Sequence, residues 1–173
     1  MKAAFVSVVL FATFACAQDQ AAIAAAEAAC GPRDVKFEAK QDATQHPVPQ
    51  PDPDKAWVYV IQDLGQVECT DCALTKVALD GTWVGANHGS SYFFFDAEPG
   101  ERHICVNWES RLESRSRVFG LANFTAEAGH VYYFRVRLLF ARSIYSFDLD
   151  PINSDQGKFL VASSAFSVSH PKK

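Results

Sequence analysis

The chain has 173 residues, of which 49% are hydrophobic, and 16 Lys+Arg against 20 Asp+Glu give a formal net charge of -4. This composition excludes a disordered chain, because disorder goes with few apolar residues and a high net charge. The acidic balance also excludes a nucleic-acid binder of the usual basic kind. We therefore expect a globular protein with no nucleic-acid partner.

Residues 1–17 have the pattern of a secretory signal peptide. Lys2 precedes an apolar run, and Ala15-Cys16-Ala17 supplies small residues at the cleavage site. The run is shorter than the roughly 20 apolar residues that cross a bilayer, so we expect no membrane span in the mature chain. A lipid anchor on Cys16 is the alternative, but the preceding residues fit the processing motif poorly. We expect export to the periplasm or the extracellular space.

Four cysteines remain after cleavage, namely Cys30, Cys69, Cys72 and Cys105. Thiols exported to an oxidising compartment usually pair, and four cysteines allow three connectivities. The two-residue gap between Cys69 and Cys72 suits a local bridge, which leaves Cys30 to join Cys105. We favour this pairing and expect all four cysteines to form disulfides.

A redox-active pair at Cys69 and Cys72 is the alternative function for these cysteines. Redox motifs lie at a helix N-terminus, whereas the residues after Cys72 alternate like a strand. The acidic Glu68 and Asp71 would raise a thiol pKa. A four-cysteine zinc site would need a second close pair. We therefore expect no metal and no cofactor.

The segment before the first long strand has two parts. The alanine-rich residues 20–29 predict a short helix, which Gly31 and Pro32 end. Residues 46–54 carry a proline at every second position, from Pro47 to Pro53, which predicts an extended strap outside any sheet. We assign residues 18–55 to this helical lead-in and strap.

Most of the remaining chain predicts β-strands separated by turns. Asp80-Gly81 marks a hairpin, and Pro99-Gly100 and Ala128-Gly129 mark further turns. The expected strands cover residues 35–39, 56–61, 77–79, 82–84, 91–95, 102–108, 131–140 and 145–149. Ser154-Asp155 favours a short helix through Leu160, although the same residues also suit a strand.

These elements predict a mainly β fold, a single antiparallel β-sandwich with a short N-terminal helix and a short C-terminal helix. We expect the sandwich to occupy residues 56–168 and a polar tail to occupy residues 169–173.

The order of these motifs resembles a known bacterial pattern. The hairpin Val77–Gly85, the aromatic strand Ser91–Phe93, the turn Glu98–His103 and the segment Glu127–Phe134 follow one another as in the exported domain of unknown function 2846 family. The chain also resembles the small PEGA-type β-sandwich modules of bacterial envelopes. The resemblance covers about Trp57 to Leu149. It implies an extracytoplasmic β-sandwich and supplies no catalytic residues.

Three groups of side chains are candidates for a metal, acid–base or partner-binding site. His88, His103 and Asp96 would form a metal site if the hairpin brought them together, but exposed loop histidines explain them more simply. Asp148 and Asp150 suit acid–base or calcium chemistry, but also a turn that ends a strand. The aromatic run near Tyr92 and Phe94 is expected in the core, or at a partner surface if one sheet face is open.

The arginines form the densest basic region of this acidic chain. We expect them to face anionic glycans or lipid headgroups, or to form an ordinary ion-paired surface with neighbouring glutamates. The residues concerned are Arg111, Arg115, Arg117, Arg135, Arg137 and Arg142.

The sequence therefore predicts a non-enzymatic binding or structural module of the bacterial cell envelope, with an envelope protein or a glycan as its partner. The alternatives are a thiol-redox enzyme that uses Cys69 and Cys72, and a binder of glycans or anionic lipids through the arginine-rich strands.

Overall fold

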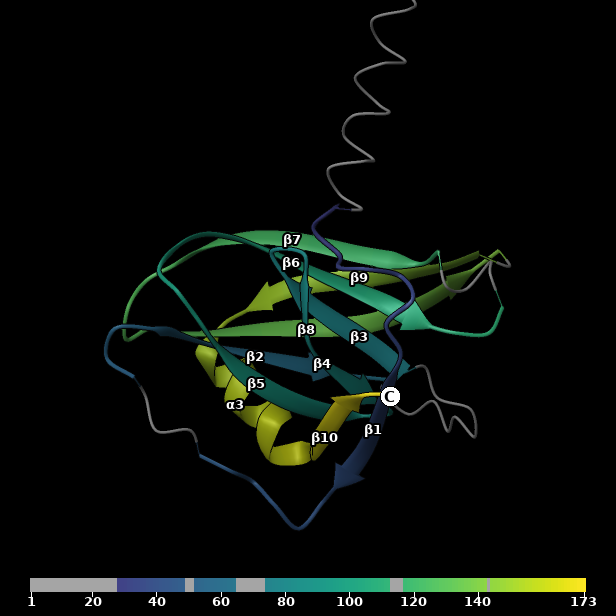
Figure 1. Cartoon of the computed structure of the whole chain (residues 1–173). Coiled ribbons are helices and arrows are strands. Elements are labelled where there is room, and N and C mark those ends of the chain that lie inside the picture. The colour runs from purple at the N-terminus through teal and green to yellow at the C-terminus, as the bar shows by residue number, and fades with distance from the viewer. Residues whose placement is uncertain (1–27, 49–51, 65–73, 113–116, 143) are drawn as a thin grey trace, which may run out of the picture.

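Two β-sheets face each other in the computed structural model, which describes residues 28–48, 52–64, 74–112, 117–142 and 144–173 (Figure 1). Sheet A has six strands in the order β1-β10-β5-β2-β8-β9. Their bounds are β1 Phe37–Asp42, β10 Ala165–Pro171, β5 Ser91–Ala97, β2 Ala56–Gln62, β8 Val131–Ala141 and β9 Ile144–Ile152. Sheet B has four strands in the order β4-β3-β6-β7. Their bounds are β4 Thr82–His88, β3 Leu74–Leu79, β6 Gly100–Glu109 and β7 Phe119–Ala126.

The predicted sandwich is confirmed, with one difference in strand direction. β2 pairs with β8 in parallel and β10 pairs with β5 in parallel, so sheet A is mixed rather than antiparallel throughout. After β2 the chain forms β3 and β4 of sheet B, returns to sheet A as β5, forms β6 and β7 of sheet B, and then returns as β8, which lies beside β2 in the same direction. The alternation of side chains predicts a strand but not the direction of its partner strand. The sequence pattern therefore did not predict the parallel pairs.

The core lies between the sheets and is apolar. It contains alternate residues of strands from both sheets, as the sequence pattern predicts. Its buried members include Val58, Val60, Val77, Phe93, Ile104, Val106, Phe134, Val136 and Leu149.

β2 is buried on both faces, as expected for a central strand. Val58 and Val60 face the core between the sheets, whereas Tyr59 and Ile61 belong to a second cluster on the outer face of sheet A. The helix α3 (Ser154–Ser163) contributes Leu160 to this second cluster. Sheet A is therefore covered on one face by sheet B and, around β2, on the other by α3 (Figure 1).

The C-terminal segment is helical from Ser154 and then returns to the sheet. The N-cap of α3 is Asn153, whose side chain accepts a hydrogen bond from the Gln156 backbone at 2.9 Å, and not the expected Ser154. β10 continues to Pro171, three residues past the boundary predicted at 168, because β1 pairs with it along its length. β1 itself lies within residues 18–55, which the sequence assigned to the lead-in and strap. Among the described residues, no helix has the length and apolarity to cross a membrane.

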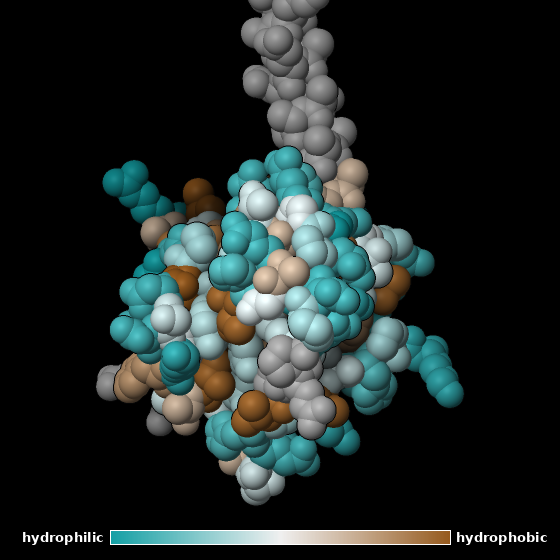
Figure 2. All heavy atoms as spheres, turned by 90° about the vertical axis from the view of Figure 1, so that its left-hand side faces the viewer, coloured by the Kyte–Doolittle hydropathy of each residue, from teal (hydrophilic) through white to brown (hydrophobic). Residues whose placement is uncertain are grey.

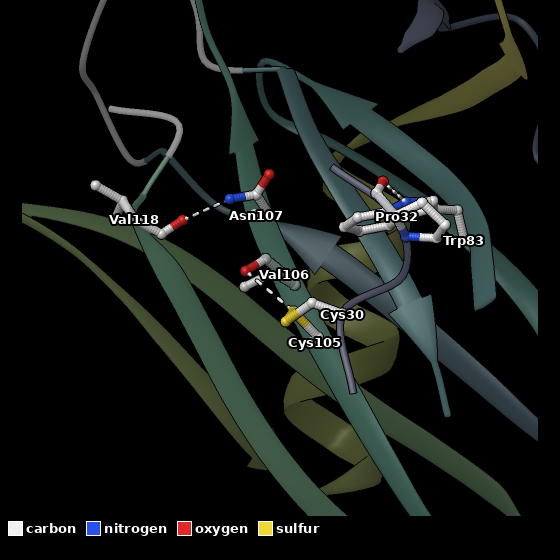
Figure 3. The surroundings of a disulfide bond; sticks show 7 residues. All are labelled: Cys30, Pro32, Trp83, Cys105, Val106, Asn107 and Val118. Atoms are coloured by element: carbon white, nitrogen blue, oxygen red, sulfur yellow. Dashed lines mark hydrogen bonds between the residues drawn. A yellow bond between two sulfur atoms is a disulfide. The ribbon is translucent and has the colours of Figure 1, made fainter. Parts of the chain in front are cut away.

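The N-terminal part of the described chain crosses the outer face of sheet B (Figure 3). Cys30 forms a disulfide with Cys105 of β6, as the sequence predicts. Trp83 donates its indole N–H to the Pro32 carbonyl at 2.8 Å, and the buried Lys76 ammonium donates to the Val35 carbonyl at 2.9 Å. Burial lowers the pKa of Lys76, and the Trp83 ring 4.2 Å from its Nζ helps to accommodate the charge. The helix expected over residues 20–29 lies almost entirely outside the described residues.

Asp80 connects the two turns that the sequence singles out. It adopts φ 48 and precedes Gly81 at φ 80, as a two-residue hairpin requires. Its carboxylate accepts the His103 backbone N–H at 2.8 Å and the Arg102 guanidinium at 3.0 Å. Arg102 also donates to the Glu98 carbonyl at 2.7 Å. The motif residues of both turns thus form one hydrogen-bonded network that positions β6 against β3.

Removing the disulfide will reduce stability more than most single substitutions. The bridged cysteines are 75 residues apart, and in the chain-entropy model a loop of that length contributes about 4 kcal/mol. We expect the Cys30→Ala/Cys105→Ala variant to unfold in urea with a free energy lower by about that amount. Adding a reductant to the wild type will give a similar loss. An unchanged denaturation midpoint in the double variant would contradict this role.

Replacing Asp80 will destabilise the sandwich. Asp80→Ala removes the hydrogen bonds from His103 and Arg102, and alanine tolerates a positive φ less well than aspartate. We therefore expect the free energy of unfolding, measured in urea, to fall by about 1–3 kcal/mol. Asp80→Asn will lose less, because it keeps an acceptor for His103. Glu101→Ala, at an exposed site on β6, is the matched control and will change stability by less than about 0.5 kcal/mol. Equal effects of the alanine substitutions at Asp80 and Glu101 would refute the proposed role.

Candidate ligand-binding site

A cavity of about 350 Å³ lies on the outer face of sheet A, between α3 and the strap. Three tyrosines form its floor: Tyr59 of β2, Tyr92 of β5 and Tyr133 of β8. Figure 2 shows a mainly polar surface with apolar residues in its lower half, where Figure 1 places α3 and the strap. The other lining residues are His46, Pro47, Val48, Lys158, Val161 and Ala162.

The tyrosines converge because three adjacent strands present the same face. Tyr59 is in register with Tyr133 across the parallel β2–β8 pair, and their rings stack with centroids 5.0 Å apart. Tyr92 is opposite Ile61 in the β2–β5 pair, and its ring lies 6.3 Å from that of Tyr59. Residues that alternate along a strand share a face, so sheet pairing alone builds this aromatic floor.

The strap forms one wall of the cavity. His46 stacks on Tyr92 with centroids 6.2 Å apart, and its Nδ1 lies 3.4 Å from the Tyr92 hydroxyl. The adjoining Pro47 and Val48 supply apolar surface. The expected extended strap thus has a role that the sequence did not indicate, because it covers the edge of the tyrosine floor.

The helix α3 forms the opposite wall, and Gly157 allows it to lie close to the sheet. A Cβ atom at Gly157 would lie 2.2 Å from Cγ of Tyr133, so a larger residue would move the helix away. Lys158 and Val161 then face the cavity from α3. A glycine within a helix has a conformational cost, and here close packing against an aromatic ring explains its presence.

The tyrosine hydroxyls remain protonated at neutral pH. Burial, together with the neighbouring Tyr133 and Tyr92, raises the pKa of Tyr59 to about 12. Burial also raises the pKa of Tyr92 and of Tyr133. Tyr92 is fully buried and its hydroxyl lies next to His46, so the polar groups that the described lining residues offer are the Tyr59 and Tyr133 hydroxyls, the His46 imidazole and the Lys158 ammonium.

The structure does not bring together His88, His103 and Asp96, the alternative metal site. His88 pairs with Leu74 at one end of β3, whereas His103 lies next to Ile104, which pairs with Leu79 at the other end. Asp96 is in sheet A, where it accepts from Lys55 at 2.6 Å. The described residues contain no group of three or more metal-ligating side chains. Cys69 and Cys72 lie outside the described residues, as does Arg115.

Two of the arginines considered for anion binding are paired with aspartates. Arg135 donates to Asp63, and Arg137 donates to Asp148 and, at 3.1 Å, to Asp150. The sequence suggested glutamates as partners, but the register places aspartates of β9 beside β8. Asp148 and Asp150 therefore serve as ion-pair partners of Arg137 on the outer face of sheet A.

Sequence reasoning did not identify the tyrosine cavity. The available signal was the alternation in β2, β5 and β8, which places an aromatic residue on the second face of each strand. The sequence indicated a partner surface at Tyr92 and Phe94 if one face were open. Nothing in the sequence indicated that β2 and β8 are neighbours, or that α3 and the strap flank the tyrosines on the outer face of sheet A.

A comparison with protein families matches residues 52–146 to the family described as a protein of unknown function, DUF2846. The chain belongs to this family. No curated protein and no solved structure matches the chain. The family match confirms the resemblance to the DUF2846 family noted in the sequence.

Some residues that line the cavity lie inside the DUF2846 match and others lie outside it. The three floor tyrosines lie within residues 52–146, whereas His46 of the strap and Lys158 of α3 lie outside this range. The family region thus supplies the aromatic floor, and the flanking segments of this chain supply both walls.

Tyr59 will make stability sensitive to alkaline pH. Because its pKa in the folded protein is raised from 10.0 to about 12, the unfolded chain loses this proton first. The contribution of the protonated phenol to stability is complete below about pH 10 and is lost as the pH rises towards about 12. In urea denaturation at a series of pH values, Tyr59→Phe will lose less stability over this range than the wild type. Identical pH dependence in both proteins would contradict the assignment.

Proposed function

We propose that this DUF2846 protein is an exported, non-enzymatic binding module of the bacterial cell envelope. Its ligand is a small amphipathic anion that occupies the tyrosine cavity. The signal-peptide pattern of residues 1–17 and the Cys30–Cys105 disulfide support export. The observation that carries the binding function is the cavity itself, in which polar groups from three strands, a helix and the strap converge.

The chemistry of the lining favours an anion with an apolar body. The described lining residues include one ammonium and three protonated phenols but no carboxylate. Hydrogen-bond donors and a positive charge stabilise a carboxylate or phosphate group. The aromatic rings with Pro47, Val48 and Val161 provide the surface against which an apolar body is removed from water. A volume of about 350 Å³ suits a small molecule rather than a polymer.

Binding is tested with a matched pair of probes, phenylacetate and phenylacetamide, on the purified chain. We expect saturable shifts of tyrosine ring signals in NMR spectra with phenylacetate and weaker binding of the amide, which has no charge. Lys158→Met will weaken phenylacetate binding about fivefold, the equivalent of about 1 kcal/mol. Lys40→Met, at an exposed position on β1, is the control and will bind like the wild type.

A second variant tests the position of the helix. Gly157→Ala places a methyl group against Tyr133, so we expect it to weaken binding of both probes. Circular dichroism will show whether the variant keeps its sheets. Equal binding of the two probes, or loss of binding in Lys40→Met but not in Lys158→Met, would refute an anion site in this cavity.

A further inference from the structure

The β8–β9 hairpin ends in an exposed apolar tip. Leu139, Phe140 and Ile144 are 44%, 61% and 69% exposed, respectively. Leu112, in the loop that follows β6, is 55% exposed. Single exposed apolar residues are ordinary, but a group at one end of a sandwich indicates an interaction surface.

The tip extends beyond its neighbour in sheet A and contacts sheet B. The parallel pairing of β8 with β2 ends at Val136, whereas the pairing with β9 continues to Ala141. Phe140 packs on Tyr145 with centroids 4.6 Å apart, and Tyr145 packs on Trp108 of β6 at 5.1 Å. This aromatic contact packs the hairpin against sheet B. Figure 1 shows the hairpin at the end of the sandwich opposite α3.

The exposed charged side chains that the structure describes at the tip are positive. Arg142 is exposed in the turn, at φ 50, and Arg111 is exposed beside Leu112. Residues 138–146 contain no acidic side chain. Of the described acidic residues near the tip in sequence, Glu109 accepts the Phe37 backbone N–H at 2.7 Å and Asp148 pairs with Arg137, whereas Glu113, which follows Leu112, lies outside the described residues. Arg142 and Arg111 thus differ from Arg135 and Arg137 of β8, which pair with aspartates, because they lie beside exposed apolar side chains.

We propose that this tip docks on the surface of an anionic lipid bilayer. Phe140 and Ile144 enter the interface, and Arg142 and Arg111 meet lipid phosphates. A convex tip suits a fluid surface that deforms around it, and cations beside apolar side chains match the charge and polarity of an anionic interface. The surface is separate from the tyrosine cavity, and the proposal does not depend on a ligand there.

Vesicle flotation of the purified full chain tests the proposal. We expect binding to phosphatidylcholine vesicles that contain about one third phosphatidylglycerol, weaker binding to pure phosphatidylcholine, and a decrease with salt. Phe140→Ser/Ile144→Ser will bind about tenfold more weakly, and Arg142→Gln about fivefold more weakly with less salt dependence. Phe159→Ser/Val168→Ser, at exposed apolar sites elsewhere, will bind like the wild type. All variants share one N-terminus, so their differences report on the tip.

Two results would overturn the proposal. One is equal flotation of the tip variant and the control variant. The other is absence of vesicle binding together with self-association in analytical ultracentrifugation that Phe140→Ser/Ile144→Ser abolishes, which would assign the tip to a second copy of the chain. Lys158→Met will leave flotation unchanged, so failure of the cavity function and failure of lipid docking are distinguishable.

Discussion

Burial of β2 on both faces is the constraint on which the rest of the structure depends. One face places Val58 and Val60 in the core between the sheets, and the other places Tyr59 and Ile61 beneath α3. Because Tyr59 lies between Tyr92 and Tyr133 on the neighbouring strands, the strand that organises the core also organises the floor of the cavity. Core packing and the candidate site therefore share one element, and a change in its register would disturb both.

The turn motifs by which the chain resembles its family act in the fold, whereas Tyr92 and Tyr133, which lie in its other motifs, form part of the cavity floor. Asp80, Arg102 and His103 connect the two turns, and Gly85 allows close packing because its Cβ would lie 2.5 Å from the Phe93 ring. Segments outside the matched residues 52–146 cover the outer faces. The strap and α3 enclose the tyrosines, while the N-terminal segment is held on sheet B by the Cys30–Cys105 disulfide.

Local patterns in the sequence predicted the local features of the fold. Alternation predicted the strands, and Asp80-Gly81 predicted a hairpin. The Cys30–Cys105 pairing followed from cysteine spacing. The sequence did not predict the parallel β2–β8 pairing, the approach of His46 to Tyr92, or the aspartate partners of Arg135 and Arg137. These features depend on which strands become neighbours, and a single sequence does not encode that choice in its local periodicity.

Hydrogen exchange measured by mass spectrometry tests the central claim most directly. If both faces of β2 are covered, the amides of residues 58–61 will exchange only through global unfolding and will be the slowest in the chain, together with their partners in β5 and β8. The account predicts that these peptides exchange far more slowly than those of the edge strand β7. If β2 exchanged as fast as β7, α3 would not cover the sheet, and the two-faced burial of β2 would be contradicted.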